Sequence, residues 1–377
     1  MSLILFNFTV MENVKIVDVI NYLEKLVPLS TQEDYDNCGL LVGEKDNLVT
    51  NILISLDCTE EIVQEAIDKK CEMVISHHPI IFKGLKKITG SDYVQRTILK
   101  AIKNGIAIYA IHTNLDNYRF GVNYQIAKRL GLKNTSILAP KEASLSKLIV
   151  YVPEDHAENL SNFLFEAGAG NIGNYSECHF KSIGIGTFKP GFAANPFDGE
   201  IGKRSEVREV KTEYLVENSK MRNVLAALFA NHPYEEIAYD IVPIENENKY
   251  EGAGMIGELD EEISQIDFIN KVKELFQCDS IRTTKTQHNS IRKVALCGGS
   301  GSFLIQKAKI QKADVYITSD MKYHEFFDAD NQILLMDIGH YESEQYTKHL
   351  IADILKKNFT NFAIHLTERN TNPIKYW

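Results

Sequence analysis

Residues 71–79 read CEMVISHHP, an apolar run of strand type that passes through Ser76 into two histidines and then a proline. Pro79 cannot donate a hydrogen bond to a neighbouring strand, so we expect His77 and His78 to lie where a buried strand ends. In open α/β sheets, ligands bind in the crevice beyond the carboxyl ends of the parallel strands. The two imidazoles are therefore candidates for a functional site.

The flanking sequence places this strand in a parallel sheet. An apolar strand at 51–56 (NILISL) is followed by a helix at 59–69, with Thr59 as its N-cap, and then by the strand at 73–76. This order predicts a βαβ unit with a right-handed crossover. A further strand at 106–111 (IAIYAI) runs into His112 and Asp116. Helices are predicted over three other segments, 16–26, 93–104 and 123–130.

The pattern of the middle of the chain is different. Strands are predicted at 147–153, 176–187, 207–216 and 237–244, and helices at 154–167 and 221–230, with a Gly/Pro-rich excursion at 188–203. The order β-α-β-β-α-β is typical of a ferredoxin-like α+β domain. We find no cluster of catalytic type in it.

The last segment repeats the pattern of the first. Helix 263–276, strand 293–296, helix 303–311 and strand 315–317 precede Asp320 and His324, and strand 333–336 precedes His340, Glu344 and a helix at 344–357. We therefore predict an α/β protein made of duplicated α/β/α units with pseudo-twofold symmetry and an inserted ferredoxin-like domain. The expected domains are 11–140, 141–247 and 248–377.

The strand ends carry imidazole and carboxylate groups in a repeated spacing. A histidine and a carboxylate four residues apart at a helix start lie on one face, so both side chains can reach one ion. His112 with Asp116 and His340 with Glu344 have this spacing, and the histidine pair at 77–78 adds two nitrogens. Imidazole and carboxylate without thiolate suit zinc first, with iron, manganese or cobalt as alternatives. The ligands exceed the needs of one catalytic ion, which favours two divalent ions bridged by a carboxylate.

The sequence gives weaker evidence for functional roles of other polar groups. Asp320 and His324, like His112, are interpreted as outer partners of the ligands or as proton-transfer groups. The glycine-rich CGGSGS at 297–302 follows a strand and precedes a helix, so it either cradles a phosphate or forms a tight turn, and we favour the turn. The loop FKGLKK at 82–87 either attracts an anion or is simply solvated. No metal role is expected for four other histidines: His179, His232, His349 and His365.

The composition of the chain narrows the classes of function that it can have. The 377 residues carry a net charge of −10, which argues against a general nucleic-acid binder. The six cysteines are scattered without a C-x-x-C pair, as expected for free thiols in a reducing, cytoplasmic compartment. We find no signal peptide and no apolar run of membrane-spanning length, so no membrane partner is expected. Met11 is a candidate for the natural start, with residues 1–10 as either an added lead or a poorly ordered one.

Five motifs together resemble one known family. They are SHHP, HTNLD followed by GVN, GAGMIGEL, TSDMKYH and DIGHYESE, and they resemble the GTP cyclohydrolase I type 2-like family, also called the NGG-interacting-factor-three-like family. The match runs from DNCGLLVG at 36–43 to near the C terminus and keeps the order of the motifs. Ser319 departs from the pattern, because the family usually has TGD where this chain has TSD. The stretch NHPYEEIAYDIVPI at 231–244 looks like the end of the PII- and CutA-like insert of the long form.

The resemblance implies a dinuclear metal site, a toroidal homohexamer and a small-molecule substrate. By position in the motifs, His78 and Asp116 would hold one ion, His77 and His340 the other, and Glu344 would touch both. The resemblance nominally implies GTP cyclohydrolase activity, in which an activated water attacks C8 of guanine, the imidazole ring opens and formate leaves. We therefore predict a metal-dependent hydrolase acting on a nucleotide or related small molecule. The alternatives are a metal-handling or regulatory protein without turnover, and a scaffold whose ions only stabilise the fold.

Overall fold

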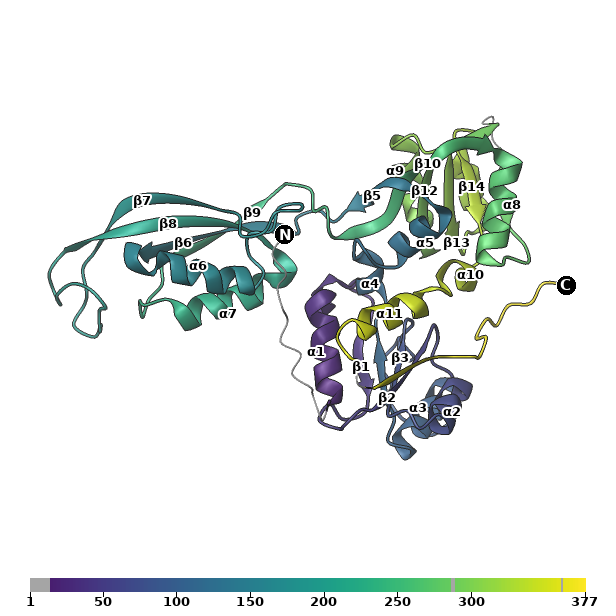
Figure 1. Cartoon of the computed structure of the whole chain (residues 1–377), viewed down its shortest axis with the longest axis horizontal. Helices are drawn as coiled ribbons and strands as arrows, with labels where there is room; N and C mark the ends of the chain where they lie inside the picture. The colour runs from purple at the N-terminus through teal and green to yellow at the C-terminus, as the bar shows by residue number, and fades with distance from the viewer. Residues whose placement is uncertain (1–13, 286–288, 361) are drawn as a thin grey trace. The chain divides into compact units, whose positions relative to one another are not determined.

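The computed structural model describes residues 14–285, 289–360 and 362–377, and the predicted start at Met11 lies outside them. The chain forms two compact units (Figure 1). One unit contains the chain up to residue 139 and again from residue 250, and the other contains residues 140–249. Among the described helices, none has both the length and the apolar character needed to span a membrane.

The first unit contains two mixed sheets, and the first of these carries the predicted βαβ unit. Its strands run in the order β1-β4-β3-β2-β15, with β1 antiparallel to β4 and the other neighbours parallel. The Thr59 hydroxyl accepts from the Ile62 N–H and caps α2 as predicted. The elements are β1 (Gly39–Val42), β2 (Asn51–Ser55), α2 (Glu60–Asp68), β3 (Met73–Ser76), α3 (Tyr93–Lys103), β4 (Ala107–Ala110), α4 (Thr113–Asn117), α5 (Val122–Leu130) and β15 (Ala363–Leu366).

The second sheet has the order β11-β14-β13-β12-β10-β5. Strands β12, β13 and β14 are parallel, and β10 and β11 pair antiparallel with β12 and β14. The elements are β5 (Lys133–Pro140), β10 (Gly252–Ser264), α8 (Gln265–Phe276), β11 (Arg282–Thr283), β12 (Ser290–Ser300), α9 (Ile305–Ile310), β13 (Val315–Ser319), β14 (Leu334–Asp337), α10 (His340–Glu344) and α11 (Thr347–Lys356).

The two sheets pack against a shared helical layer. One core cluster joins inward side chains of both sheets, such as Ile54 and Val294, to residues of α1 (Ile16–Leu26), α5, α8 and α11. A separate cluster packs the other face of the first sheet on α2 and α3, and another packs the other face of the second sheet on α9. Both faces of the central strands are therefore buried, as expected for parallel strands.

Three expectations need correction. The predicted helix at 344–357 begins later, at Thr347 of α11, because Glu344 is the last residue of the separate helix α10. The predicted helix at 303–311 starts with a 3₁₀ turn, Ser302–Leu304, before α9. The first four residues of CGGSGS, 297–300, lie inside β12 and not in a loop after it.

The second unit has the topology predicted for it. Its antiparallel sheet has the order β7-β8-β6-β9, which is the ferredoxin-like arrangement of a β-α-β-β-α-β chain. Two helices cover one face, where Leu148, Tyr214, Leu164 and Leu228 meet in the core. The elements are β6 (Leu145–Pro153), α6 (Ala157–Glu166), β7 (His179–Phe188), β8 (Ser205–Glu217), α7 (Met221–Asn231) and β9 (Tyr239–Ile244).

Candidate metal centre

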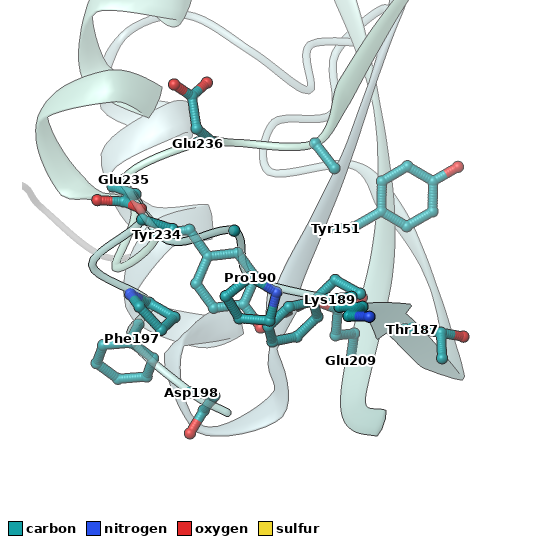
Figure 2. Close-up of a pocket in the computed structure, with 16 residues that line it drawn as sticks. Tyr151, Thr187, Lys189, Pro190, Phe197, Asp198, Glu209, Tyr234, Glu235 and Glu236 are labelled. Atoms are coloured by element: carbon teal, nitrogen blue, oxygen red, sulfur yellow. Dashed lines mark hydrogen bonds between the residues drawn. The ribbon is translucent and has the colours of Figure 1, made fainter. Parts of the chain in front are cut away.

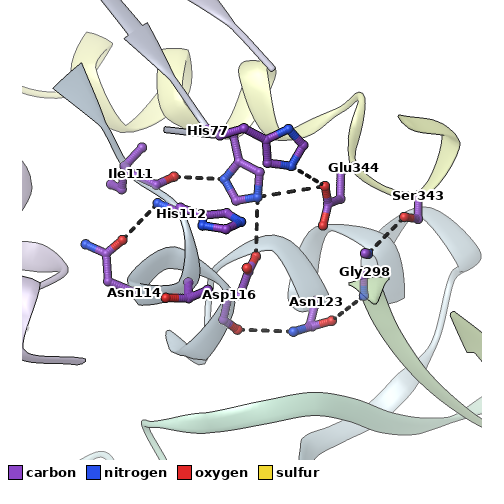
Figure 3. Close-up of polar contacts among 12 residues, drawn as sticks. His77, Ile111, His112, Asn114, Asp116, Asn123, Gly298, Ser343 and Glu344 are labelled. Atoms are coloured by element: carbon purple, nitrogen blue, oxygen red, sulfur yellow. Dashed lines mark hydrogen bonds and ion pairs between the residues drawn. The ribbon is translucent and has the colours of Figure 1, made fainter. Parts of the chain in front are cut away.

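Six predicted side chains meet at the carboxyl ends of the parallel strands. Figure 3 shows four of them, His77, His112, Asp116 and Glu344. They come from the segment after β3, from His112 and α4 after β4, and from α10 after β14. Groups of three whose ligand atoms all lie within 4.8 Å of one another are His77/His78/His112, His78/His340/Glu344 and His77/Asp116/Glu344. The prediction that these residues would be brought together by the strand ends therefore agrees with the structure.

Each of the four imidazoles is held through its Nδ1 atom. The partner is always an oxygen, so Nδ1 donates and, in the neutral ring, the lone pair resides on Nε2. The bonds are His77 to Ile111 O (2.8 Å), His78 to Asp57 Oδ1 (2.7 Å), His112 to Asp36 Oδ1 (2.9 Å) and His340 to Asp320 Oδ2 (2.6 Å). This is how histidines that bind metals are usually oriented.

The Nε2 atoms converge on one carboxylate. Glu344 Oε2 lies 2.9 Å from His78 Nε2 and 3.0 Å from His340 Nε2, and these two nitrogens are 3.3 Å apart. His77 Nε2 is 4.0 Å from the same oxygen and 3.5 Å from Asp116 Oδ1. Both His77 Nε2 and Asp116 Oδ1 are buried and have no hydrogen-bond partner among the described residues. These two atoms therefore lie close together with no hydrogen-bond donor from another residue that the structure describes.

The pKa values of His340, His78 and Glu344 show how protons alone would balance the charge of the cluster. Attraction by Glu344 outweighs burial and raises the pKa of His340 to about 11. Burial lowers the pKa of His78, but hydrogen bonds with Asp57 and Glu344 outweigh it and raise that pKa to about 9. Although burial opposes ionisation of Glu344, the two imidazoliums hold its pKa well below the usual range. Without an ion, protons on two histidines therefore supply the positive charge that Glu344 requires.

Protonation leaves two other members of the cluster, His77 and Asp116, without a partner among the described residues for their facing atoms. Burial lowers the pKa of His77 to about 3, so this ring stays neutral. Burial and the nearby Glu344 raise the pKa of Asp116 well above its usual value. A buried neutral imidazole and a carboxyl that resists ionisation are left unpaired, and a divalent cation would satisfy both. The donor set of nitrogen and carboxylate oxygen therefore fits metal ions such as zinc.

The closest atoms are grouped differently from the pairs that the family resemblance implies. In the structure His77 groups with Asp116 and Glu344, and His78 groups with His340 and Glu344. In both groupings Glu344 is the shared member, since its carboxylate is within 4.0 Å of all three imidazoles in these pairs.

Sequence reasoning missed two aspartates. Asp57 lies two residues after the end of β2, so the rule that identified the other strand ends also applies to it. Asp36 precedes β1, and its position depends on β1 running antiparallel to β4, which pairs Gly39 with Ala110. Of the outer candidates, Asp320 contacts His340, whereas the contacts found for the exposed His324 are ring contacts with Tyr323 and Phe327.

The N–H groups of two glycines of β12 donate to side chains around the cluster and so are already used within the protein. The Gly298 N–H donates to Asn123 Oδ1, and the Gly299 N–H donates to Ser343 Oγ (Figure 3). Gly299 has a φ of +63°, and a Cβ at this position would overlap the Glu344 carboxylate. The glycine is thus required for the close approach of β12 to Glu344.

A cavity of about 700 Å³ opens onto the cluster. Tyr35, Phe82 and Phe303 contribute aromatic rings to its lining. His112 and four of the five ligand candidates also line it: His78, Asp116, His340 and Glu344. None of its lining residues is Lys or Arg, and the lysines of FKGLKK are exposed outside it.

Comparisons with known proteins follow the same motifs along the whole chain. The model of the Duf34/NIF3 (NGG1p interacting factor 3) family matches residues 14–373. A Bacillus subtilis relative named GTP cyclohydrolase 1 type 2 homolog is 38% identical over 364 residues, covering 95% of this chain and 97% of the relative. The crystal structure of a Bacillus cereus protein related to NIF3 matches with 38% identity and a TM-score of 0.83, covering 97% of this chain and 99% of that one. A Staphylococcus aureus crystal structure matches with 33% identity and a TM-score of 0.76, covering 97% of this chain and all of the other.

Proposed function

The chain belongs to the Duf34/NIF3 family, and we propose that it is a metal-dependent hydrolase acting on a nucleotide or a related small molecule. The observation that carries the proposal is that His77 Nε2 and Asp116 Oδ1 are buried without a hydrogen-bond partner among the described residues, within a cluster of imidazoles and carboxylates that adjoins a 700 Å³ cavity. His77, His78, Asp116, His340 and Glu344 would hold two divalent ions, with zinc as first choice and iron, manganese or cobalt as alternatives.

Bound divalent ions would supply Lewis acidity and lower the pKa of a water molecule. The chain itself would position the substrate and move protons. His112 lines the cavity, and Asp36 accepts from its Nδ1, so Nε2 is left to take a proton. Asp36 is itself fixed by the N–H and hydroxyl of Thr113. Asp320 would orient His340, and His324 stays a weaker candidate for proton transfer.

The cavity favours a substrate with a planar ring. Phe303 is 67% exposed and Tyr35 is 64% exposed, so part of each ring is available for stacking on a ligand. Because no cationic side chain lines the cavity, the phosphates of a nucleotide would have to be held by the metal ions. GTP is the nominal substrate, since the close relatives carry the name of a GTP cyclohydrolase homolog.

The test is turnover by metal-loaded protein. We expect formate to be released from GTP or a related guanine compound, and we expect Glu344→Gln to abolish the release. Glu342→Gln is the matched control, because Glu342 lies on the same helix, is also buried, and accepts from Asn372 outside the cavity. Turnover that persists in Glu344→Gln would refute the mechanism.

The second candidate is a metal-handling or regulatory protein. It is favoured by His340, which is partly exposed at the cavity and gives ions a route out. This function would be favoured over the hydrolase if the chain transferred ions rapidly to a metal-free acceptor protein and turned over none of a panel of nucleotides. Slow transfer with turnover would eliminate it.

We also infer that the first unit is a duplication with pseudo-twofold symmetry. The order β1-β4-β3-β2 in one sheet matches β11-β14-β13-β12 in the other, with the same parallel triple and the same antiparallel edge strand. Helix α4 after β4 likewise corresponds to α10 after β14. The domain limits 11–140, 141–247 and 248–377, the homohexamer and the cytoplasmic location stay predictions, and light scattering tests the hexamer.

A further inference from the structure

We propose that the ferredoxin-like unit carries a second binding site, which takes a small organic cation with an apolar body, such as a quaternary ammonium compound. The site is a cavity of about 550 Å³ lined entirely by residues of this unit. This volume is in the range of small-molecule sites. The inference is independent of the metal centre and of the hydrolase proposal.

Four segments build the cavity (Figure 2). The end of β7 and the loop after it provide residues 186–191, 194 and 196–198. Tyr151 of β6 and Glu209 of β8 provide the sheet side, and residues 234–236 and 238, before β9, close the opposite side. The Gly/Pro-rich excursion and the HPYEE stretch, which the metal centre does not use, therefore come together here.

Aromatic rings form the walls. The Tyr234 ring lies 6.5 Å from Phe188 and 6.1 Å from Phe197, with interplanar angles of 55° and 50°. The Tyr234 hydroxyl donates to Glu209 Oε1 (2.9 Å), and its N–H donates to His232 Nδ1 (3.1 Å). Tyr234 is thus fixed at both ends, while Phe197 is 52% exposed. Phe197 also contacts the His156 ring at 5.4 Å, and its exposed half is the part that a ligand could reach.

The lining carries a strong excess of negative charge. Its carboxylates are Asp198, Glu209, Glu235 and Glu236, against a single cation, Lys189. Among the described residues no Lys or Arg forms an ion pair with any of the four. Their hydrogen bonds come from neutral donors, Tyr234 to Glu209 and the Asn195 N–H to Glu235. The negative charge is therefore left for a ligand to balance.

This chemistry selects the ligand class. An anion is disfavoured by the carboxylates, and a neutral apolar molecule would leave them unbalanced. A bare metal ion is not favoured either, because the described His, Cys, Asp and Glu groups that converge closely enough for one all lie in the other unit. An organic cation satisfies both features, since ring faces attract a cation and the carboxylates complement its charge.

The test is titration calorimetry of the purified full-length chain with choline and with its uncharged isostere, 3,3-dimethylbutan-1-ol. The two molecules have the same shape, so a difference between them measures the charge preference of the site. We expect saturable binding of choline and at least about tenfold weaker binding of the isostere. Phe197→Leu keeps apolar area but removes a π face, and Glu209→Gln keeps the acceptor for Tyr234 but removes a charge. Each is expected to weaken choline binding several-fold.

Glu206→Gln is the matched control, because Glu206 is exposed on the same strand and lies outside the lining. It removes the same charge and should bind choline as the unmodified chain does. The proposal is overturned if choline shows no saturable binding at millimolar concentration, or if the isostere binds equally well. It is also overturned if Phe197→Leu and Glu209→Gln bind choline like the control. Circular dichroism of each variant confirms that the fold is kept.

Discussion

Metal binding to the cluster should release at least two protons at pH 7, one each from His78 and His340, with a further contribution from Asp116 because its pKa is raised. In the ion-free chain the pKa of His78 is about 9 and that of His340 is about 11, so both rings carry a proton at neutral pH. Their Nε2 atoms face Glu344 at 2.9 and 3.0 Å and are the atoms that a cation would need. A cation must therefore displace both protons before it can use these nitrogens.

The sign and size of the pH effect follow from this count. Each displaced proton makes the apparent affinity rise tenfold per pH unit while the pH is below the pKa of its group. Two protons make the apparent affinity rise about 100-fold per pH unit between pH 6 and 8. This corresponds to about 2.7 kcal/mol of binding free energy per pH unit. Above a pH near 9 His78 is already deprotonated, so the slope should fall to that of the single proton on His340.

The assay is calorimetric titration with zinc in two buffers that differ in ionisation enthalpy, which yields the number of protons released. Glu344→Gln is the internal control, since loss of the carboxylate removes the main cause of the raised pKa of His340 and one of the causes for His78, and should lower the proton count. A release near zero at pH 7 in the unmodified chain, or an affinity independent of pH between 6 and 8, would refute the reasoning.

Other substitutions test the parts around the cluster. Asp57→Asn and Asp320→Asn should each lower zinc affinity about 10- to 100-fold, because they weaken the bonds that orient His78 and His340, as competition with a chelating dye would measure. Thr371→Val removes only the hydroxyl that donates to Asp57, and a loss larger than about tenfold in the same assay would contradict this role. Gly299→Ala should lower the free energy of unfolding by about 3 kcal/mol through its positive φ and its overlap with Glu344, as urea titration would show. Gly131→Ala, with a positive φ but open space around it, should cost only about 1 kcal/mol, and equal losses for the two variants would argue against the overlap.

The ligand candidates could be predicted because their placement depends on one rule. Parallel strands end at the same edge of a sheet, so side chains that follow β3, β4 and β14 share the edges that face the cluster. The histidine pair, Asp116, His340 and Glu344 needed only correct strand assignments, and these were local patterns. Asp57 follows the same rule after β2, so its signal was present in the sequence and was overlooked.

The rest depended on long-range pairing that no local pattern carries. Strand β15, from the C-terminal end, pairs with β2 in the first sheet, and β5, which precedes the insert, lies beside β10 in the second. Both are edge strands with partly polar sequences, so hydrophobic periodicity does not separate them from loops. Asp36 was missed for the same reason, since only the antiparallel pairing of β1 with β4 brings it to His112.

The same long-range contacts explain how the ligands from the two sheets are held in register. The Asp116 carbonyl accepts from the Asn123 side chain, which in turn accepts from the Gly298 N–H, and the next residue, Gly299, donates to Ser343 beside Glu344. This series of bonds runs from α4 through α5 and β12 to α10 (Figure 3). Asp116 and Glu344 therefore cannot move apart without breaking backbone hydrogen bonds of β12. Ions bound by both carboxylates would stabilise the same arrangement, so metal binding and the docking of the two sheets should strengthen each other.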